Sequence, residues 1–161
     1  MSKPSIEKGV NFIKGQIDAP VASFFSSCIH CGLCAEACLF YTETGDPKQT
    51  PINKVEPMRR VWEQEFTVLG KLKSMVGLGK PVDEKVFSEW ETLVYDGCSL
   101  CGRCSLVCPV GNDISGMIRK IREGFSAAGH APEGLISATQ RAVEIGSPMG
   151  VKLPAVKAQI R

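Results

Sequence analysis

The sequence contains the run Cys98-Ser99-Leu100-Cys101-Gly102-Arg103-Cys104-Ser105-Leu106-Val107-Cys108-Pro109. Three cysteines recur at a spacing of three residues, and a fourth follows four residues later with a proline behind it. This is the C-x2-C-x2-C-x3-C-P pattern whose thiolates hold a cubane [4Fe–4S] cluster. The same cysteine spacing occurs upstream in Cys28-Ile29-His30-Cys31-Gly32-Leu33-Cys34-Ala35-Glu36-Ala37-Cys38. All eight cysteines of the chain fall in these two runs, which predicts two iron–sulfur clusters.

Disulfides and zinc are the alternatives for eight cysteines. Disulfide frameworks belong to exported proteins, and the N-terminal residues show neither an apolar stretch nor twin arginines that would direct export. Structural zinc takes four ligands, usually as two separated C-x2-C pairs, and does not require three cysteines in strict register. Both alternatives therefore rank behind iron–sulfur, and a zinc-stabilised interaction module is kept as a remote possibility.

The ligands of each cluster are expected to come from both runs. In two-cluster ferredoxins the fourth cysteine of each run ligates the other cluster. The predicted set for cluster 1 is thus Cys28, Cys31, Cys34 and Cys108. The predicted set for cluster 2 is Cys98, Cys101, Cys104 and Cys38. His30 lies inside the first run, but four cysteines per cluster leave it no required role as a ligand.

Composition limits the class of protein. The chain has 161 residues, with 19 Lys and Arg against 17 Asp and Glu. This balance gives no electrostatic reason to expect nucleic-acid binding. No apolar run reaches the roughly 20 residues that a membrane-spanning helix needs. We therefore expect a cytoplasmic protein that would meet a membrane only through partners.

Helical spacing of apolar residues predicts an all-α fold around the two clusters. Residues 1–18 resemble a loosely ordered arm, interrupted by Gly9 and Gly15, and 19–150 form the domain, followed by a tail at 151–161. A short helix leads from Pro20 toward Cys28, and 44–51 form a loop. The expected longer helices cover about 57–69, then Pro81 to Gly97, then Asn112 or Asp113 to Gly124, and finally Pro132 to Gly146. The last fifteen residues look irregular.

Residues 70–80 mix lysine, glycine and apolar side chains. The simpler interpretation is a solvated connection between two helices. The alternative is a basic, apolar surface that docks onto a partner or a membrane.

The two cysteine runs are separated by 59 residues, between Cys38 and Cys98, in which helices are expected. This arrangement resembles the α-helical ferredoxin fold of succinate dehydrogenase iron–sulfur subunits. Within that group the chain is most similar to the family of the C-type subunits of heterodisulfide reductase, which includes the C-type subunits of the sulfur-oxidising heterodisulfide-reductase-like complex. The similarity covers roughly 23–150. It is carried by residues 28–34, Thr44-Gly45-Asp46-Pro47, 98–113, Gly134-Leu135-Ile136 and Gly146-Ser147-Pro148-Met149-Gly150.

This resemblance implies an electron-transfer subunit without a substrate site of its own. It would pass single electrons between a flavin-containing A-type subunit and a catalytic B-type subunit with CCG domains. The expected context is sulfur oxidation. The alternative is an iron–sulfur subunit of a quinone-linked, membrane-associated oxidoreductase, in which residues 70–80 would be the place to look for membrane contact.

Overall fold

The computed structural model describes residues 5–77, 84–151 and 153–159, and every regular element in these ranges is a helix. The prediction of an all-α fold is confirmed, and the described ranges contain no β-strand. The chain divides into two compact units, 1–130 and 131–161, and each is described by itself.

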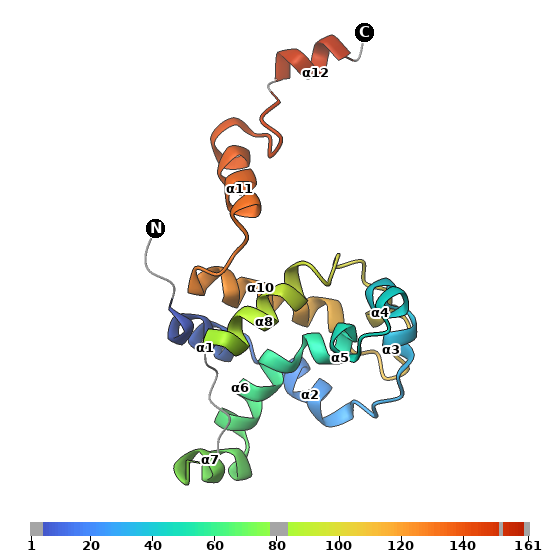
Figure 1. The fold of residues 1–161 in the computed structure, drawn as a ribbon, viewed down its shortest axis with the longest axis vertical. Coiled ribbons are helices and arrows are strands. Elements are labelled where there is room, and N and C mark those ends of the chain that lie inside the picture. The colour runs from blue at the N-terminus through green and yellow to red at the C-terminus, as the bar shows by residue number, and fades with distance from the viewer. Residues whose placement is uncertain (1–4, 78–83, 152, 160–161) are drawn as a thin grey trace. The chain divides into compact units, whose positions relative to one another are not determined.

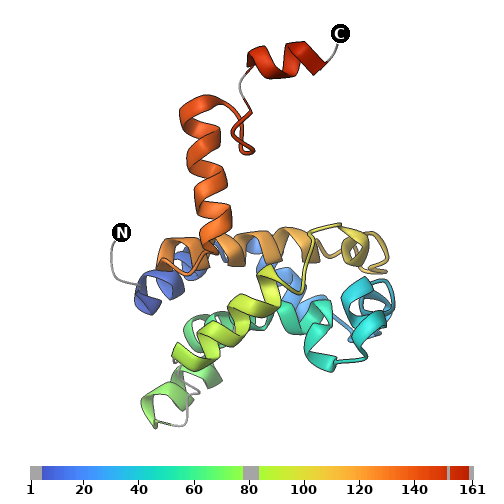
Figure 2. The same ribbon diagram turned by 45° about the horizontal axis from the view of Figure 1, so that its top comes forward.

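The first unit contains ten α-helices and one 3-10 helix among its described residues (Figure 1). They are α1 (Ile6–Gly15), α2 (Ala19–Ser27), α3 (Leu33–Glu36), α4 (Leu39–Thr44), η1 (Pro47–Gln49), α5 (Pro51–Lys54), α6 (Glu56–Phe66), α7 (Val68–Met75), α8 (Glu84–Tyr95), α9 (Arg103–Leu106) and α10 (Ile114–Ala128). Both views place α3 and α4 at one end of this unit, away from α1 and α7 (Figure 2). The cysteine runs therefore lie at the end that α3 marks.

Helix α10 is the central element of the core. Its apolar residues recur at helical spacing and are buried: Ile114, Met117, Ile118, Ile121, Phe125 and Ala128. Asp113 caps the helix by accepting a hydrogen bond from the Gly116 amide, as the sequence predicted. The expected end at Gly124 is wrong, because the helix continues to Ala128 and ends at Gly129, whose φ is +84°.

Gly124 does not end a helix; it allows a close contact between α1 and α10. A Cβ atom there would collide with the Ile13 side chain and lie 3.3 Å from the Gly9 carbonyl oxygen. A Cβ on Gly9 would in turn lie 2.8 Å from the Ala128 Cβ and 3.1 Å from the Gly124 carbonyl oxygen. The two glycines face each other and let the backbones of α1 and α10 approach closely.

The arm expected at residues 1–18 is correspondingly a helix over Ile6–Gly15. Ile13 is 1% exposed within the core, and the Ser5 amide donates a hydrogen bond to the Ala128 carbonyl. The prediction of loose order was wrong because Gly9 marks a helix–helix contact and Gly15 lies in the last turn of α1.

The helix expected at about 57–69 is two helices, α6 and α7, which meet at Thr67. Gly70 permits this turn, because a Cβ there would collide with the Glu63 carbonyl group of α6. Residues 70–75 are helical, whereas a connection was expected, and 78–80 lie outside the described residues. Helix α8 ends at Tyr95, ahead of Gly97, as predicted, while its expected start at Pro81 also lies outside the described residues.

The second unit contains α11 (Glu133–Ile145) and α12 (Leu153–Gln159). Helix α11 follows Pro132 and ends at Gly146, whose φ is +74°, in agreement with the sequence. The irregular structure expected for the last fifteen residues is wrong over Leu153–Gln159. Across the described ranges of both units, none of the helices has the length and apolarity needed to cross a bilayer.

The contact between α1 and α10 predicts that Gly9→Ala destabilises the protein. Alanine favours a helix over glycine by roughly 1 kcal/mol, but the added methyl group overlaps the Ala128 Cβ. Overpacking of this kind costs about 1–3 kcal/mol, so the free energy of unfolding should fall. Anaerobic chemical denaturation of the purified protein measures it.

Gly15→Ala is the matched control in the same helix. Nothing lies within 4 Å of a Cβ at Gly15, so this change should leave stability unchanged or raise it by roughly 0.4–1 kcal/mol. If Gly9→Ala were as stable as Gly15→Ala, the close contact would be refuted.

Candidate iron–sulfur centres

The two cysteine runs adopt the same backbone conformation. Among the described residues, the only non-glycine residues with positive φ are His30 (+52°) and Leu100 (+54°), which hold equivalent positions 70 residues apart. Gly32 and Gly102 are also equivalent, with φ of +84° and +78°. A left-handed conformation costs a non-glycine residue of order 1–3 kcal/mol, and such residues concentrate at functional sites. The repeated strain therefore indicates that both loops are shaped for the same task.

The hydrogen bonds after these loops also match pairwise. The amides of Ala35 and Ser105 donate to the carbonyls of Gly32 and Gly102, at 2.8 and 3.0 Å. One turn later, the amides of Cys38 and Cys108 donate to Ala35 and Ser105, at 2.9 and 3.3 Å. The helices α3 and α9 thus carry the fourth cysteine of each run in the same way.

The chain leaves the two runs differently, since Cys108 is followed by Pro109 and Cys38 by Leu39. Cys38 is the N-cap residue of the short helix α4, which ends at Thr44. The loop predicted at 44–51 is wrong over Pro47–Gln49, which form the 3-10 helix η1. Cys108 is followed by a turn and then by α10. Ser105 of the second run accepts a hydrogen bond from the Ser115 amide at 3.0 Å and donates one to Asp113 at 3.1 Å. These bonds fix the second run to the start of α10.

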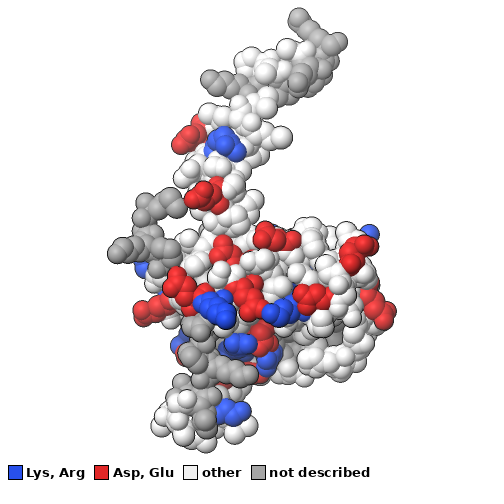
Figure 3. Space-filling view, viewed as in Figure 1, with Lys and Arg blue, Asp and Glu red and all other residues white. Residues whose placement is uncertain are grey.

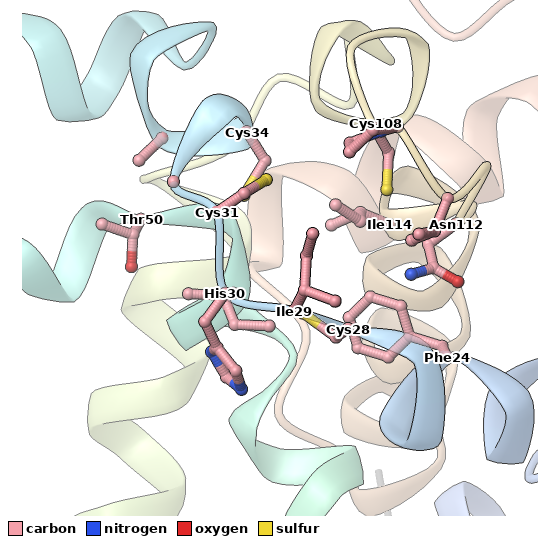
Figure 4. Close-up of a pocket in the computed structure, with 15 residues that line it drawn as sticks. Phe24, Cys28, Ile29, His30, Cys31, Cys34, Thr50, Cys108, Asn112 and Ile114 are labelled. Carbon is pink, nitrogen blue, oxygen red and sulfur yellow. The ribbon is translucent and has the colours of Figure 1, made fainter.

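The structure brings Cys28, Cys31 and Cys34 of the first run together with Cys108 of the second. All four line one cavity of about 150 Å³, and Cys34 and Cys108 face it from opposite sides (Figure 4). The other lining side chains are mostly apolar: Phe24, Ile29, Ala35, Ile52, Pro109, Val110 and Ile114. The sulfur atoms surround a space instead of converging on a point. In the described ranges, no three His, Cys, Asp or Glu side chains are grouped as one metal ion would need.

Two further residues of this cavity bear on what it can hold. Asn112 lines it, and its buried Nδ2 has no hydrogen-bond partner among the described residues. A buried donor without a partner is costly, so a bound group with acceptor atoms fits this position. His30 is exposed and directs its ring away from the sulfur atoms of the cavity (Figure 4).

The other four cysteines are Cys98, Cys101 and Cys104 of the second run and Cys38 of the first, and no cavity of the described residues is lined by all four. Cys104 is buried, and the Leu100 amide donates a hydrogen bond to the Cys98 sulfur at 3.4 Å. Cys38 lies beside η1 and α5, where its sulfur is 3.8 Å from the Gln49 carbonyl oxygen. The Gln49 side chain in turn packs against Gly97, next to Cys98, with its Cδ 3.2 Å from the position of a Cβ there. Gln49 therefore joins Cys38 to the start of the second run.

Lys54 is a residue that the sequence analysis missed. It is 1% exposed, and its ammonium group donates to the Cys38 sulfur at 3.6 Å. The same group lies 5.2 Å from the centroid of the Phe40 ring, within the range of a cation–π interaction. Lys54 lies between Asn53 and Val55 in the sequence, and a single lysine there gives no pattern from which its burial could be inferred.

Burial and sulfur neighbours change the thiol pKa values. Burial raises the pKa of Cys104 to about 11, and the nearby Cys98 adds to this effect. Burial also raises the pKa of Cys34, with smaller contributions from Cys28 and Cys31. The Arg103 amide, which hydrogen-bonds the exposed Cys101, lowers the pKa of that thiol. Buried thiolates need a nearby positive charge, and iron supplies it when it replaces the protons.

Comparison with known proteins identifies the cofactors. Residues 25–112, which include both cysteine runs, match the family described as 4Fe-4S dicluster domain. The chain belongs to this family, and its cofactors are two [4Fe–4S] clusters. The resemblance seen in the sequence is therefore confirmed for the family. The repeated loops, the cysteine-lined cavity and the partnerless Asn112 donor fit such clusters.

Three relatives carry related names. The Hdr-like menaquinol oxidoreductase iron-sulfur subunit of Archaeoglobus profundus is 35% identical over 128 residues, which are 80% of this chain and 23% of that protein. The Hdr-like menaquinol oxidoreductase iron-sulfur subunit 2 of Archaeoglobus fulgidus is 38% identical over 66% of this chain and 19% of its own length. The D-type subunit of the dihydromethanophenazine:CoB–CoM heterodisulfide reductase of Methanosarcina barkeri is 27% identical over 73% of this chain and 28% of its own length.

The chain thus spans less than a third of the curated relatives that it matches. No solved structure matches the chain significantly.

The cavity predicts that Cys108→Ser and Cys28→Ser damage the same cluster. Each variant should lose about half of the roughly eight iron atoms of two [4Fe–4S] clusters, and both should lose the same EPR signal on reduction. Cys38→Ser and Cys98→Ser should form the second matching pair. If Cys108→Ser instead lost the same EPR signal as Cys98→Ser, each run would ligate its own cluster and the exchange of the fourth ligand would be refuted.

Proposed function

We propose that this protein is an electron-transfer subunit of a heterodisulfide-reductase-like oxidoreductase complex. The observation that carries this proposal is the cavity in which three cysteines of the first run meet Cys108 of the second. A fourth ligand exchanged between two equivalent loops belongs to proteins whose clusters lie close enough to exchange electrons. The shared family and the names of the relatives support the same assignment.

In this proposal Cys28, Cys31, Cys34 and Cys108 hold one cluster, and Cys98, Cys101, Cys104 and Cys38 hold the other. Each cluster, when bound, takes up or releases one electron without a change of covalent bonds in a substrate. The chain's own residues set the environment of that electron. Apolar side chains such as Phe24 and Ile114 limit access of water to the first site. The Leu100 amide hydrogen-bonds a ligand sulfur at the second.

The partners belong to the proposal as well. A flavin-containing A-type subunit and a CCG-domain B-type subunit would supply and receive the electrons in the cytoplasm. Sulfur oxidation was the expected context. The relatives from the two Archaeoglobus species are named menaquinol oxidoreductase subunits, which favours a quinone-linked context over sulfur oxidation.

The proposed function predicts the metal content and redox behaviour of the protein. Anaerobically purified protein should contain about eight iron and eight sulfide per chain, and dithionite should produce the EPR spectrum of two interacting reduced clusters. The purified reduced protein should then transfer electrons to a B-type subunit added in equal amount, followed as loss of the EPR signal. If the purified protein contained zinc and no acid-labile sulfide, the proposal would be refuted and a structural interaction module would remain.

The quinone-linked alternative is favoured by a second observation, the apolar surface of α7. Five apolar side chains of this segment recur at helical spacing, with exposed fractions between 56% for Leu72 and 85% for Val68 and Met75. We call this row the α7 face; it consists of Val68, Leu69, Leu72, Met75 and Val76. On the side of the molecule in view, the lobe that carries α7 shows basic atoms and no acidic atoms (Figure 3). An apolar row with lysines beside it suits an anionic membrane surface.

Membrane attachment through the α7 face predicts that the protein sediments with phosphatidylglycerol vesicles and less with phosphatidylcholine vesicles. Replacing both Leu69 and Leu72 by Gln should weaken this binding at least about tenfold, because a buried leucine contributes roughly 1.5–3 kcal/mol. Val143→Gln is the control, since Val143 is 83% exposed on α11. Unchanged sedimentation of the double variant would exclude the α7 face as the attachment site.

A further inference from the structure

Cations are distributed unequally around the two predicted cluster sites. The residues that line the cavity of Cys28, Cys31, Cys34 and Cys108 include no Lys or Arg. On that side, Lys48 and Arg59 lie in a neighbouring surface hollow that also contains His30. Both are paired with carboxylates, Lys48 with Glu89 and Arg59 with Glu56 and Glu63. Their charges are therefore largely neutralised.

At the second predicted site, an unneutralised cation contacts the sulfur of one predicted ligand, Cys38. The buried ammonium group of Lys54 donates to the Cys38 sulfur, and no ion pair of Lys54 with a carboxylate occurs among the described residues. Lys54 is the last residue of α5, which contacts α8 and α10 in the core and so holds the side chain in place. Coulombic interactions are strongest in such a water-poor position.

Two arginines add positive charge near the same run. Arg122 of α10 donates from Nε to the Val94 carbonyl at 2.8 Å and from Nη2 to the carbonyl of Cys98. Arg103 lies between Cys101 and Cys104 in the sequence, but its side chain is exposed and its charge is screened by water and salt. Of these three cations, Lys54 is the one that contacts a ligand sulfur directly and is screened least.

We propose that Lys54 makes the site formed by Cys98, Cys101, Cys104 and Cys38 the more easily reduced of the two. Reduction adds one negative charge to a cluster, and a fixed positive charge at a ligand sulfur stabilises the reduced form. In the cavity of the first site, the partnerless donor of Asn112 belongs to a neutral amide and brings no net charge. A single electron on this protein would therefore reside at the second site, and electrons would pass from the first site to the second.

This inference rests on the proposed function, and a redox titration followed by EPR tests it. The Cys28→Ser variant, which keeps the second site, should have a higher midpoint potential than Cys98→Ser, which keeps the first. In the otherwise unchanged protein, Lys54→Met should move one of the two midpoint potentials to a more negative value and leave the other in place. Lys54→Arg, which keeps the charge, should restore most of the difference.

Lys48→Gln is the matched control, because Lys48 is an exposed lysine close in sequence and should affect neither potential. Equal potentials in the two single-site variants, or a Lys54→Met protein with both potentials unchanged, would overturn the inference while leaving the proposed function intact. Absence of any iron–sulfur EPR signal in the unchanged protein would instead remove the proposed function itself. If Lys54→Met failed to fold, the comparison of Cys28→Ser with Cys98→Ser would still decide the order of the potentials.

Discussion

The fold depends on one constraint: a short cysteine loop supplies three ligands of a four-iron cluster, and the fourth has to come from elsewhere. In this chain the other loop lies far away in sequence, with 59 residues between Cys38 and Cys98. The helices between and after the loops hold both at one end of the first unit. Ser105, bonded to Asp113, fixes the second loop to α10, and Gln49 joins Cys38 to Gly97. The helical core thus acts as the frame for the exchanged ligands.

The sequence could predict those parts of the fold that depend on local patterns. The helices α8 and α11 were found because their apolar residues recur at helical spacing and glycines follow them. Gly9 and Gly124 were misread because glycine has two uses that look alike in a sequence. One use ends a helix in a left-handed conformation, as at Gly129, and the other lets two helices touch. Only the packing of α1 on α10 distinguishes them.

The same division applies to the predicted sites. Cysteine spacing was enough to propose which residues bind which cluster, because the chemistry depends on a repeated local pattern. Lys54 could not be found in this way, since its importance comes from burial and from contact with Cys38, a residue 16 positions away. The positive φ of Leu100 was also hidden, because leucine does not favour that conformation and adopts it only where the surrounding structure enforces it. Non-local contacts therefore carry the information that the sequence patterns lack.

The two runs are nearly equivalent in backbone conformation but have different surroundings. This difference would set the direction of electron transfer between the two sites. Equivalent turns and matching hydrogen bonds make each run suitable for the same kind of cluster. Two sites in identical environments would have equal potentials and would favour electron flow in neither direction. The surroundings of the fourth cysteines differ: Cys38 leads into α4 and lies against the Lys54 ammonium, whereas Cys108 leads into a turn and lines an apolar cavity. Differences beyond the ligands themselves, in charge and burial, are what tune the potential of a cluster.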